Sequence, residues 1–253
     1  MTALIENEAP AGAAIAAIRR GDIDALLRLI GDVPGLASAT IQRAACRDQP
    51  PYTYPLIAAT TDWPGHFPRV AESIAVLVAA GADVNARSYG GGTTETALHG
   101  AASSDDVTAL DALLDAGAAI DAPGAVIAGG TPLDDAVAFA QWQAARRLVE
   151  RGAEVAVWHA AALGLVDRLA THFTAGQPPA RYPWGRDAPD RDDTTIAFWC
   201  ACHGGQRAAA EFLLARGADP SWRTPWDSLT PLDAARRSHA DELADWLVSI
   251  GAR

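Results

Sequence analysis

Apolar residues recur along the chain at spacings of three and four, which is the period of an α-helix. Residues 195–219 show the pattern. Small residues, Ala197 and Ala201 among them, share one side of a first predicted helix, and Leu213 belongs to the apolar stripe of a second. A pair of glycines separates the two helices, and Gly217 follows the second, where a left-handed residue commonly ends a helix. Two helices this short cannot bury their apolar faces alone, so the pattern predicts neighbours of the same kind.

Copies of this segment are present. Second helices end in a leucine followed a few residues later by Gly-Ala, at 77–85, 113–121, 148–154 and 213–219. First helices begin with Thr, then Ala or Pro, then Leu, at 96–102, 131–136 and 230–235. These motifs, recurring in a fixed order, resemble the ankyrin repeat, whose units carry a T-P-L-H-x-A signature and a period of about 33 residues. The resemblance implies an all-α ankyrin-repeat solenoid of about seven helix-turn-helix units with short β-hairpin fingers.

The pattern also predicts how the chain is divided. Residues 1–12 lack it and are expected to form a flexible tail, and residues 13–253 are expected to form a single ankyrin-repeat domain. That domain comprises an N-terminal cap at about 13–40, repeats at about 53–220 and a C-terminal cap at about 229–252. Insertions at 60–68 and 177–193 enlarge two of its loops, and long insertions in compact proteins are usually functional or disordered. The second insertion carries Tyr182 and Trp184, so we expect it to be ordered and packed.

Charge and composition narrow the classes of partner. The net charge of −11 argues against nucleic acid and against an anionic membrane surface, both of which require a basic face. A basic or neutral protein partner is easier to accommodate, and a small-molecule ligand stays possible. No secretory signal and no apolar run of about 18 residues is evident, and three cysteines are too few for a disulfide framework. A cytoplasmic location is therefore expected.

Aromatic side chains are the main candidates for recognition. Seven of the eight tryptophans lie in the second half of the chain, and large rigid aromatics often carry the energy of binding surfaces. The resemblance implies that recognition uses hairpin tips and exposed positions of the first helices. The candidate binding residues are Trp63, His66, Tyr89, Trp158, His159, Tyr182, Trp184, Trp199, Cys202, His203, Trp222 and Trp226.

Each candidate also has a structural interpretation. Trp158, His159 and Trp199 either pack between neighbouring units or form one wall of an aromatic pocket roofed by the 177–193 loop. The 60–68 loop, with Trp63 and His66, either packs on itself or forms a second lip of the groove. His99 occupies the signature position and is expected to hold backbone groups of the turns, with Asp134 and Asp233 in the same role; Trp158 aligns with this position. Cys200 falls at a small-residue position and is expected to pack.

Catalysis has weak support from the sequence. No nucleophile elbow, phosphate loop or zinc-protease motif is present, so only His159 and His203 stand as weak acid–base candidates. Cys200 and Cys202 are two apart on a predicted helix and do not share a face, so no metal site is expected, and no cofactor is implied. The predicted function is a recognition scaffold that binds a protein partner through a concave, Trp-rich groove. The alternative is a small-molecule binding protein or an enzyme with a His/carboxylate pocket beneath the 177–193 loop.

Overall fold

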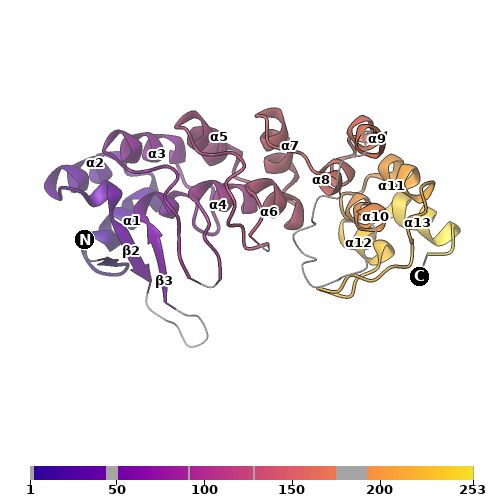
Figure 1. The fold of residues 1–253 in the computed structure, drawn as a ribbon. Helices are drawn as coiled ribbons and strands as arrows, with labels where there is room; N and C mark the ends of the chain where they lie inside the picture. Colours follow the sequence, from indigo (N-terminus) through magenta and orange to yellow (C-terminus); the bar gives the residue numbers. More distant parts are fainter. Residues whose placement is uncertain (1–2, 44–50, 91, 128, 175–192, 253) are drawn as a thin grey trace. The chain divides into compact units, whose positions relative to one another are not determined.

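A computed structural model describes residues 3–43, 51–90, 92–127, 129–174 and 193–252. The chain divides into two compact units, residues 1–152 and residues 153–253. The described residues are mostly helical, and the first unit adds a small three-stranded sheet (Figure 1). None of the described helices is both long and apolar enough to cross a membrane.

Helices follow one another in pairs in both units. The first unit contains α1 (Ala11–Arg20), α2 (Ile23–Asp32), η1 (Leu36–Ser38), η2 (Leu56–Thr60), α3 (Val70–Ala79), α4 (Ala97–Ser103), α5 (Val107–Asp115), α6 (Pro132–Ala138) and α7 (Trp142–Glu150). The second contains α8 (Val157–Ala162), α9 (Val166–Thr174), α10 (Asp193–His203), α11 (Arg207–Leu214), α12 (Pro231–Arg237) and α13 (Asp241–Ser249). The 3₁₀-helix η2 takes the place of a first helix, paired with α3.

The turn inside each pair repeats one backbone geometry. The residue two before the second helix has a positive φ of 54° to 72° in six pairs: Gly21, Asp105, Ala140, Gly164, Gly205 and His239. The next amide donates to an alanine carbonyl five residues earlier, at 2.8–3.0 Å, and these alanines are Ala17, Ala101, Ala136, Ala160, Ala201 and Ala235. The same turn geometry therefore recurs in both units, which accounts for the repeated sequence pattern.

The Gly-Ala motif ends the second helices in a recurring way. Gly81, Gly117, Gly152, Gly217 and Gly251 all have φ between 87° and 98°, a region that favours glycine. The alanine after four of these glycines donates its N–H to the leucine carbonyl five residues back, for example Ala82 to Leu77 at 2.9 Å and Ala118 to Leu113 at 2.9 Å. This is the hydrogen bond expected at a glycine-terminated helix.

First helices begin with reciprocal caps. The Thr96 N–H donates to Nδ1 of His99 at 3.1 Å, and the N–H of Thr131 donates to Asp134 at 2.8 Å. Thr230 and Asp233 make the same bond at 3.0 Å. The prediction that the two aspartates share the role of His99 is confirmed.

In α8 the cap corrects an alignment. The N–H of Ala156 donates to Nδ1 of His159 at 3.1 Å, so His159, and not Trp158, matches the capping position of His99. His159 is the third residue of α8, as His99 is the third residue of α4, so the two imidazoles occupy the same position relative to the helix start.

A small sheet joins the N-terminal residues to the first unit. β1 (Leu4–Ile5) pairs in parallel with β2 (Thr40–Arg43), and β2 pairs antiparallel with β3 (Tyr52–Pro55). Residues 4–5, expected in a flexible tail, are thus paired with β2 of the first unit, and the small sheet adds to a fold that is mostly helical, as predicted. Burial drives this pairing, because Ile41 and its partner Tyr54 are at most 3% exposed.

The paired helices pack in two layers within each unit. In the first unit, α4 contacts η2 and α6, while α5 contacts α3 and α7 (Figure 1). In the second unit, α10 contacts α8 and α12, while α11 contacts α9. Fully buried leucines such as Leu98 and Leu110 fill the space between the layers of the first unit.

Candidate functional site

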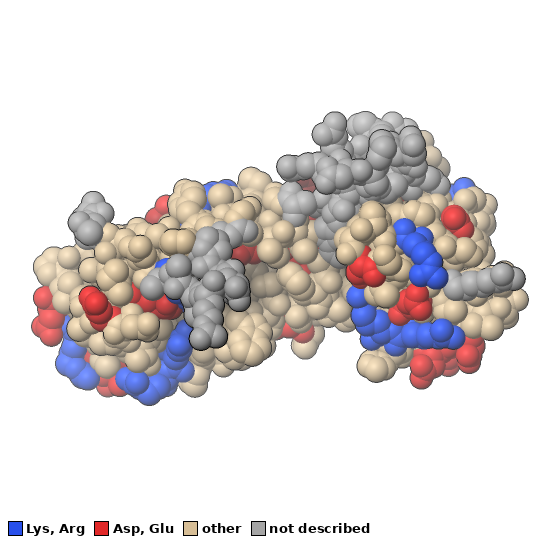
Figure 2. All heavy atoms as spheres, turned by 90° about the horizontal axis from the view of Figure 1, so that it is seen from below, with Lys and Arg blue, Asp and Glu red and all other residues tan. Residues whose placement is uncertain are grey.

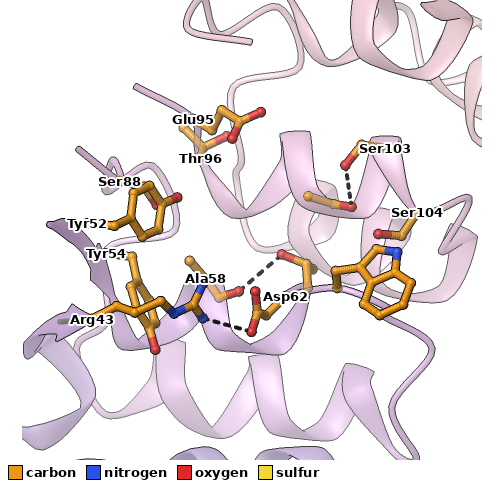
Figure 3. A pocket seen from close by; sticks show the side chains of 13 residues that line it. Arg43, Tyr52, Tyr54, Ala58, Asp62, Ser88, Glu95, Thr96, Ser103 and Ser104 are labelled. Atoms are coloured by element: carbon orange, nitrogen blue, oxygen red, sulfur yellow. Dashed lines mark hydrogen bonds and ion pairs between the residues drawn. The ribbon is translucent and has the colours of Figure 1, made fainter. Parts of the chain in front are cut away.

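A hollow opens on the first unit between the sheet, η2, α4 and the finger that precedes α4 (Figure 3). We call it the unit 1 hollow. Its lining residues are Arg43, Tyr52, Tyr54, Ala58, Thr61, Asp62, Trp63, Ser88, Glu95, Thr96, Gly100, Ser103 and Ser104. Its volume of about 170 Å³ is below the roughly 300–1,000 Å³ typical of small-molecule pockets, so it suits a single side chain better than a cofactor.

An ion-pair network borders the hollow, and its members Arg43 and Asp62 line it. The Arg43 guanidinium bonds the Glu6 carboxylate through Nε at 2.9 Å and Asp62 Oδ2 through Nη2 at 3.1 Å. The Arg19 Nη2 reaches the same Asp62 oxygen at 2.7 Å, and Tyr54 donates its hydroxyl to Glu6 at 2.8 Å. Burial raises the pKa of Glu6, but the hydrogen bonds from Arg43 and Tyr54 outweigh it and hold that pKa below its usual range. Two cations and two carboxylates therefore neutralise one another here.

Two tyrosine rings form an aromatic wall beside this network. Tyr52 and Tyr54 stack with their centroids 5.8 Å apart, and the Arg43 guanidinium lies 5.3 Å from the Tyr54 centroid. Burial raises the pKa of both phenols above their ordinary value, so both stay neutral at physiological pH. Strand β3 positions them, because residues two apart on a strand share a face.

Glu95 lies at the opposite end of the hollow (Figure 3), and its neighbour Asp135 is a buried carboxyl that does not line the hollow. Glu95 accepts the N–H of Val126 at 3.3 Å, and Asp135 accepts the N–H of Ile127 at 3.4 Å. Burial raises the pKa of Glu95. Burial and the neighbouring Glu95 charge raise the pKa of Asp135, which is fully buried, to about 8. The pair therefore retains a proton near neutral pH.

Because the folded pair retains a proton, we expect the free energy of unfolding to depend on pH. An unfolded Asp135 releases its proton near pH 4 and the folded one near pH 8, so the folded state binds more protons in between. The free energy of unfolding should fall as pH rises through that range. The Asp135→Asn variant keeps a hydrogen-bond donor without the charge, so it should be more stable than the wild type at pH 8, on the order of 2 kcal/mol. Urea denaturation at pH 5 and pH 8 measures both effects.

The matched control is Asp32→Asn, which changes an exposed carboxyl at the end of α2. It should keep the pH dependence of the wild type. Parallel pH dependences for the wild type and Asp135→Asn would show that the buried carboxyl does not hold its proton.

The 60–68 loop rests on the neighbouring helix pair and not only on itself. The N–H of His66 donates to Asp106 at 2.7 Å, and Nε2 of His66 lies 2.8 Å from the Ser104 carbonyl, which can only accept. His66 is thereby a positioning residue for the loop. Trp63 remains 83% exposed while lining the unit 1 hollow, so this loop forms a lip of the hollow.

Tyr89 projects from the finger that precedes α4. Its backbone exchanges hydrogen bonds with Thr53, at 2.7 and 2.8 Å, and Gly90 pairs with Thr93 across the finger. The Tyr89 side chain is 57% exposed. Two isolated bridges therefore mark this finger, and the one at Tyr89 lies against the edge of β3.

Most candidates of the second unit are interior. The five residues Trp158, His159, Trp199, Cys202 and His203 are at most 6% exposed. Trp199 stacks on His203 with centroids 5.3 Å apart, and its Nε1 donates to the Leu229 carbonyl at 3.3 Å. These side chains therefore pack in the interior of the second unit, and the pocket expected beneath residues 177–193 stays a prediction because residues 177–192 lie outside the described residues.

The remaining tryptophans of this group adjoin that interior. Trp226 meets Trp199 edge-on at 5.5 Å and Trp222 at 5.9 Å, and both are half-buried. The three tryptophan rings therefore form a chain of edge contacts from Trp199 through Trp226 to Trp222. Residues 177–192, which make up nearly all of the predicted roof and include Tyr182 and Trp184, lie outside the described residues.

His159 and His203, the two histidines considered for catalysis, are both buried. Both ring nitrogens of His159 face fold-internal groups, since Nδ1 lies 3.1 Å from the Ala156 N–H and Nε2 lies 3.0 Å from Nε1 of Trp158. Burial also raises the pKa of the Cys202 thiol, which disfavours a thiolate nucleophile. In the part of the chain that is described, no three His, Cys, Asp or Glu side chains are grouped to hold a metal ion.

Sequence reasoning missed several residues of the unit 1 hollow, chiefly Arg43, Tyr52, Tyr54 and Glu95. A weak signal existed in Tyr52-Thr-Tyr54, because that alternation places two aromatics on one face of a strand. No protein-family model matches the chain, and none of the curated proteins matches it.

Proposed function

We propose that the chain is an ankyrin-like recognition scaffold whose first unit binds a segment of a partner protein at the unit 1 hollow. The architecture is supported by the recurrence of the turn, the glycine-ended helix and the reciprocal cap. A link between successive helix pairs of the first unit adds support. Asn85 donates to the Gly117 carbonyl at 3.1 Å and accepts the N–H of Ala119 at 2.8 Å, which ties one helix end to the next.

The exposure of Trp63 carries the proposal. A tryptophan that is 83% exposed beside a hollow is the type of residue that anchors protein interfaces. Hydroxyl groups of Ser104 and Thr96 and the carboxyl of Glu95 surround the hollow with hydrogen-bonding groups. An aromatic anchor with a polar surround is the usual composition of an interface centre and its rim.

The surface charge fits a protein partner. Figure 2 shows acidic and basic side chains side by side on the viewed face of the first unit, instead of a continuous basic face. Together with the net charge of −11, this distribution favours a basic or neutral protein segment over nucleic acid.

Selection from a displayed library of random peptides tests the proposal. Peptides enriched on the purified wild type should bind Trp63→Ala about 30-fold more weakly, which corresponds to a hot spot of about 2 kcal/mol. The melting temperature of Trp63→Ala should stay within roughly 2 °C of the wild type, because an exposed surface residue contributes little to stability.

Leu27→Ala is the matched control, since Leu27 is an exposed apolar side chain on α2 that does not line the hollow. It should leave peptide affinity unchanged. A selection that enriches no peptide, or peptides that bind Trp63→Ala as tightly as the wild type, would remove the proposal.

A further inference from the structure

The two ends of the unit 1 hollow differ in their charge balance. At one end, Arg43 and Arg19 form ion pairs with the carboxylates of Glu6 and Asp62. At the other end, no ion pair joins Glu95 or Asp135 to a basic side chain among the described residues, and the Arg87 guanidinium instead bonds backbone carbonyls. One end of the hollow therefore holds negative charge that the described residues do not compensate.

The hydroxyl groups of the hollow present acceptors. Thr61 donates its hydroxyl proton to the Ala97 carbonyl at 2.9 Å, and Ser103 donates its proton to the Gly100 carbonyl at 3.2 Å. Their lone pairs are left for an incoming donor. A lining that is rich in acceptors favours a ligand group that only donates.

We propose that the unit 1 hollow takes the guanidinium of an arginine side chain of the partner, with Glu95 as its counter-ion and Tyr52 as its aromatic wall. This inference rests on the proposed function and specifies its ligand. A guanidinium carries five donors and no acceptor, and it stacks on aromatic faces more readily than an ammonium does. The hollow already shows this preference, because Arg43 lies over both Tyr54 and Tyr52, at 5.3 and 5.9 Å.

Size and position agree with this ligand. A hollow of about 170 Å³ accommodates one long side chain, and Trp63 at its lip is placed to cover the aliphatic stem of that side chain. Asp135 is consistent with a negative charge on Glu95, because burial favours the protonated, neutral form of Asp135.

A titration followed by NMR tests the ligand class without an identified partner. The probe is N-acetyl-arginine amide, and the control probe is N-acetyl-citrulline amide, which has nearly the same shape and no charge. The arginine probe should shift the signals of Glu95, Tyr52 and the Trp63 indole in a saturable manner, and the citrulline probe should bind at least 10-fold more weakly. N-acetyl-lysine amide should fall between the two.

The Glu95→Gln variant should reduce affinity for the arginine probe about 10-fold while keeping the melting temperature, since glutamine still accepts the Val126 N–H. The control Glu72→Gln, at an exposed carboxylate on α3, should leave the affinity for the arginine probe unchanged. Equal binding of arginine and citrulline probes, no shift with either, or full affinity in Glu95→Gln would each overturn the inference. Selected peptides that need Trp63 but contain no arginine would overturn it and leave the proposed function standing.

Discussion

Replacing Gly204 by alanine should lower the free energy of unfolding of the second unit by about 3 kcal/mol or more. A Cβ on Gly204 would lie 1.9 Å from the carbonyl oxygen of Ala162 and 2.7 Å from its carbonyl carbon. Both are backbone atoms at the end of α8, so α10 and α8 would have to separate to relieve the overlap. Urea denaturation followed by far-UV circular dichroism measures the loss.

The matched control for this substitution is Gly31→Ala. Gly31 lies within α2 and has no positive φ, and a Cβ added to it would meet no neighbouring atom within 4 Å. Because alanine favours a helix over glycine, Gly31→Ala should raise stability by up to about 1 kcal/mol. A Gly204→Ala variant as stable as the wild type would contradict the close approach of α10 and α8.

Trp199→Ala should lower the free energy of unfolding by about 3–5 kcal/mol. Trp199 is 1% exposed, stacks on His203 and donates to the Leu229 carbonyl, so its removal leaves a cavity and takes away that carbonyl's indole donor. Trp199→Phe, which keeps a ring but loses the donor, should lose less than half as much. The same denaturation experiment measures both variants.

This prediction separates a packing role from a ligand-binding role for Trp199. If its ring formed the wall of an open pocket, the alanine variant would lose ligand affinity with little change in stability. A loss of less than about 1 kcal/mol would therefore contradict the interior placement.

The helix pairs could be predicted because their determinants are local. A residue just after a second helix has a positive φ, which favours a glycine such as Gly117, and a threonine such as Thr131 caps the helix that follows it. Each motif therefore marks one helix end. The sheet could not be predicted in this way. β1 has two residues and pairs with β2 some 35 residues later, and strands this short show too few positions for an alternating pattern.

The candidate site was predictable only in part. Trp63 and Tyr89 were identified because each lies in a loop or finger that the repeat pattern sets apart. Glu95 and Arg43 were not, because they belong to distant segments whose meeting depends on the packing of the whole unit. The sequence also could not decide whether Trp199 packs or binds, since residues 194–203 of α10 are all buried and its apolar residues mark no single face.

Photo-crosslinking tests the central claim most directly. A photoreactive benzoyl-phenylalanine at position 63 is compared with the same residue at position 27, two exposed apolar sites of which only Trp63 lines the unit 1 hollow. In cells that express the chain, we expect position 63 to yield a discrete adduct with a partner protein and position 27 to yield none. No adduct at position 63, or the same adducts at both positions, would contradict a partner-binding hollow on the first unit.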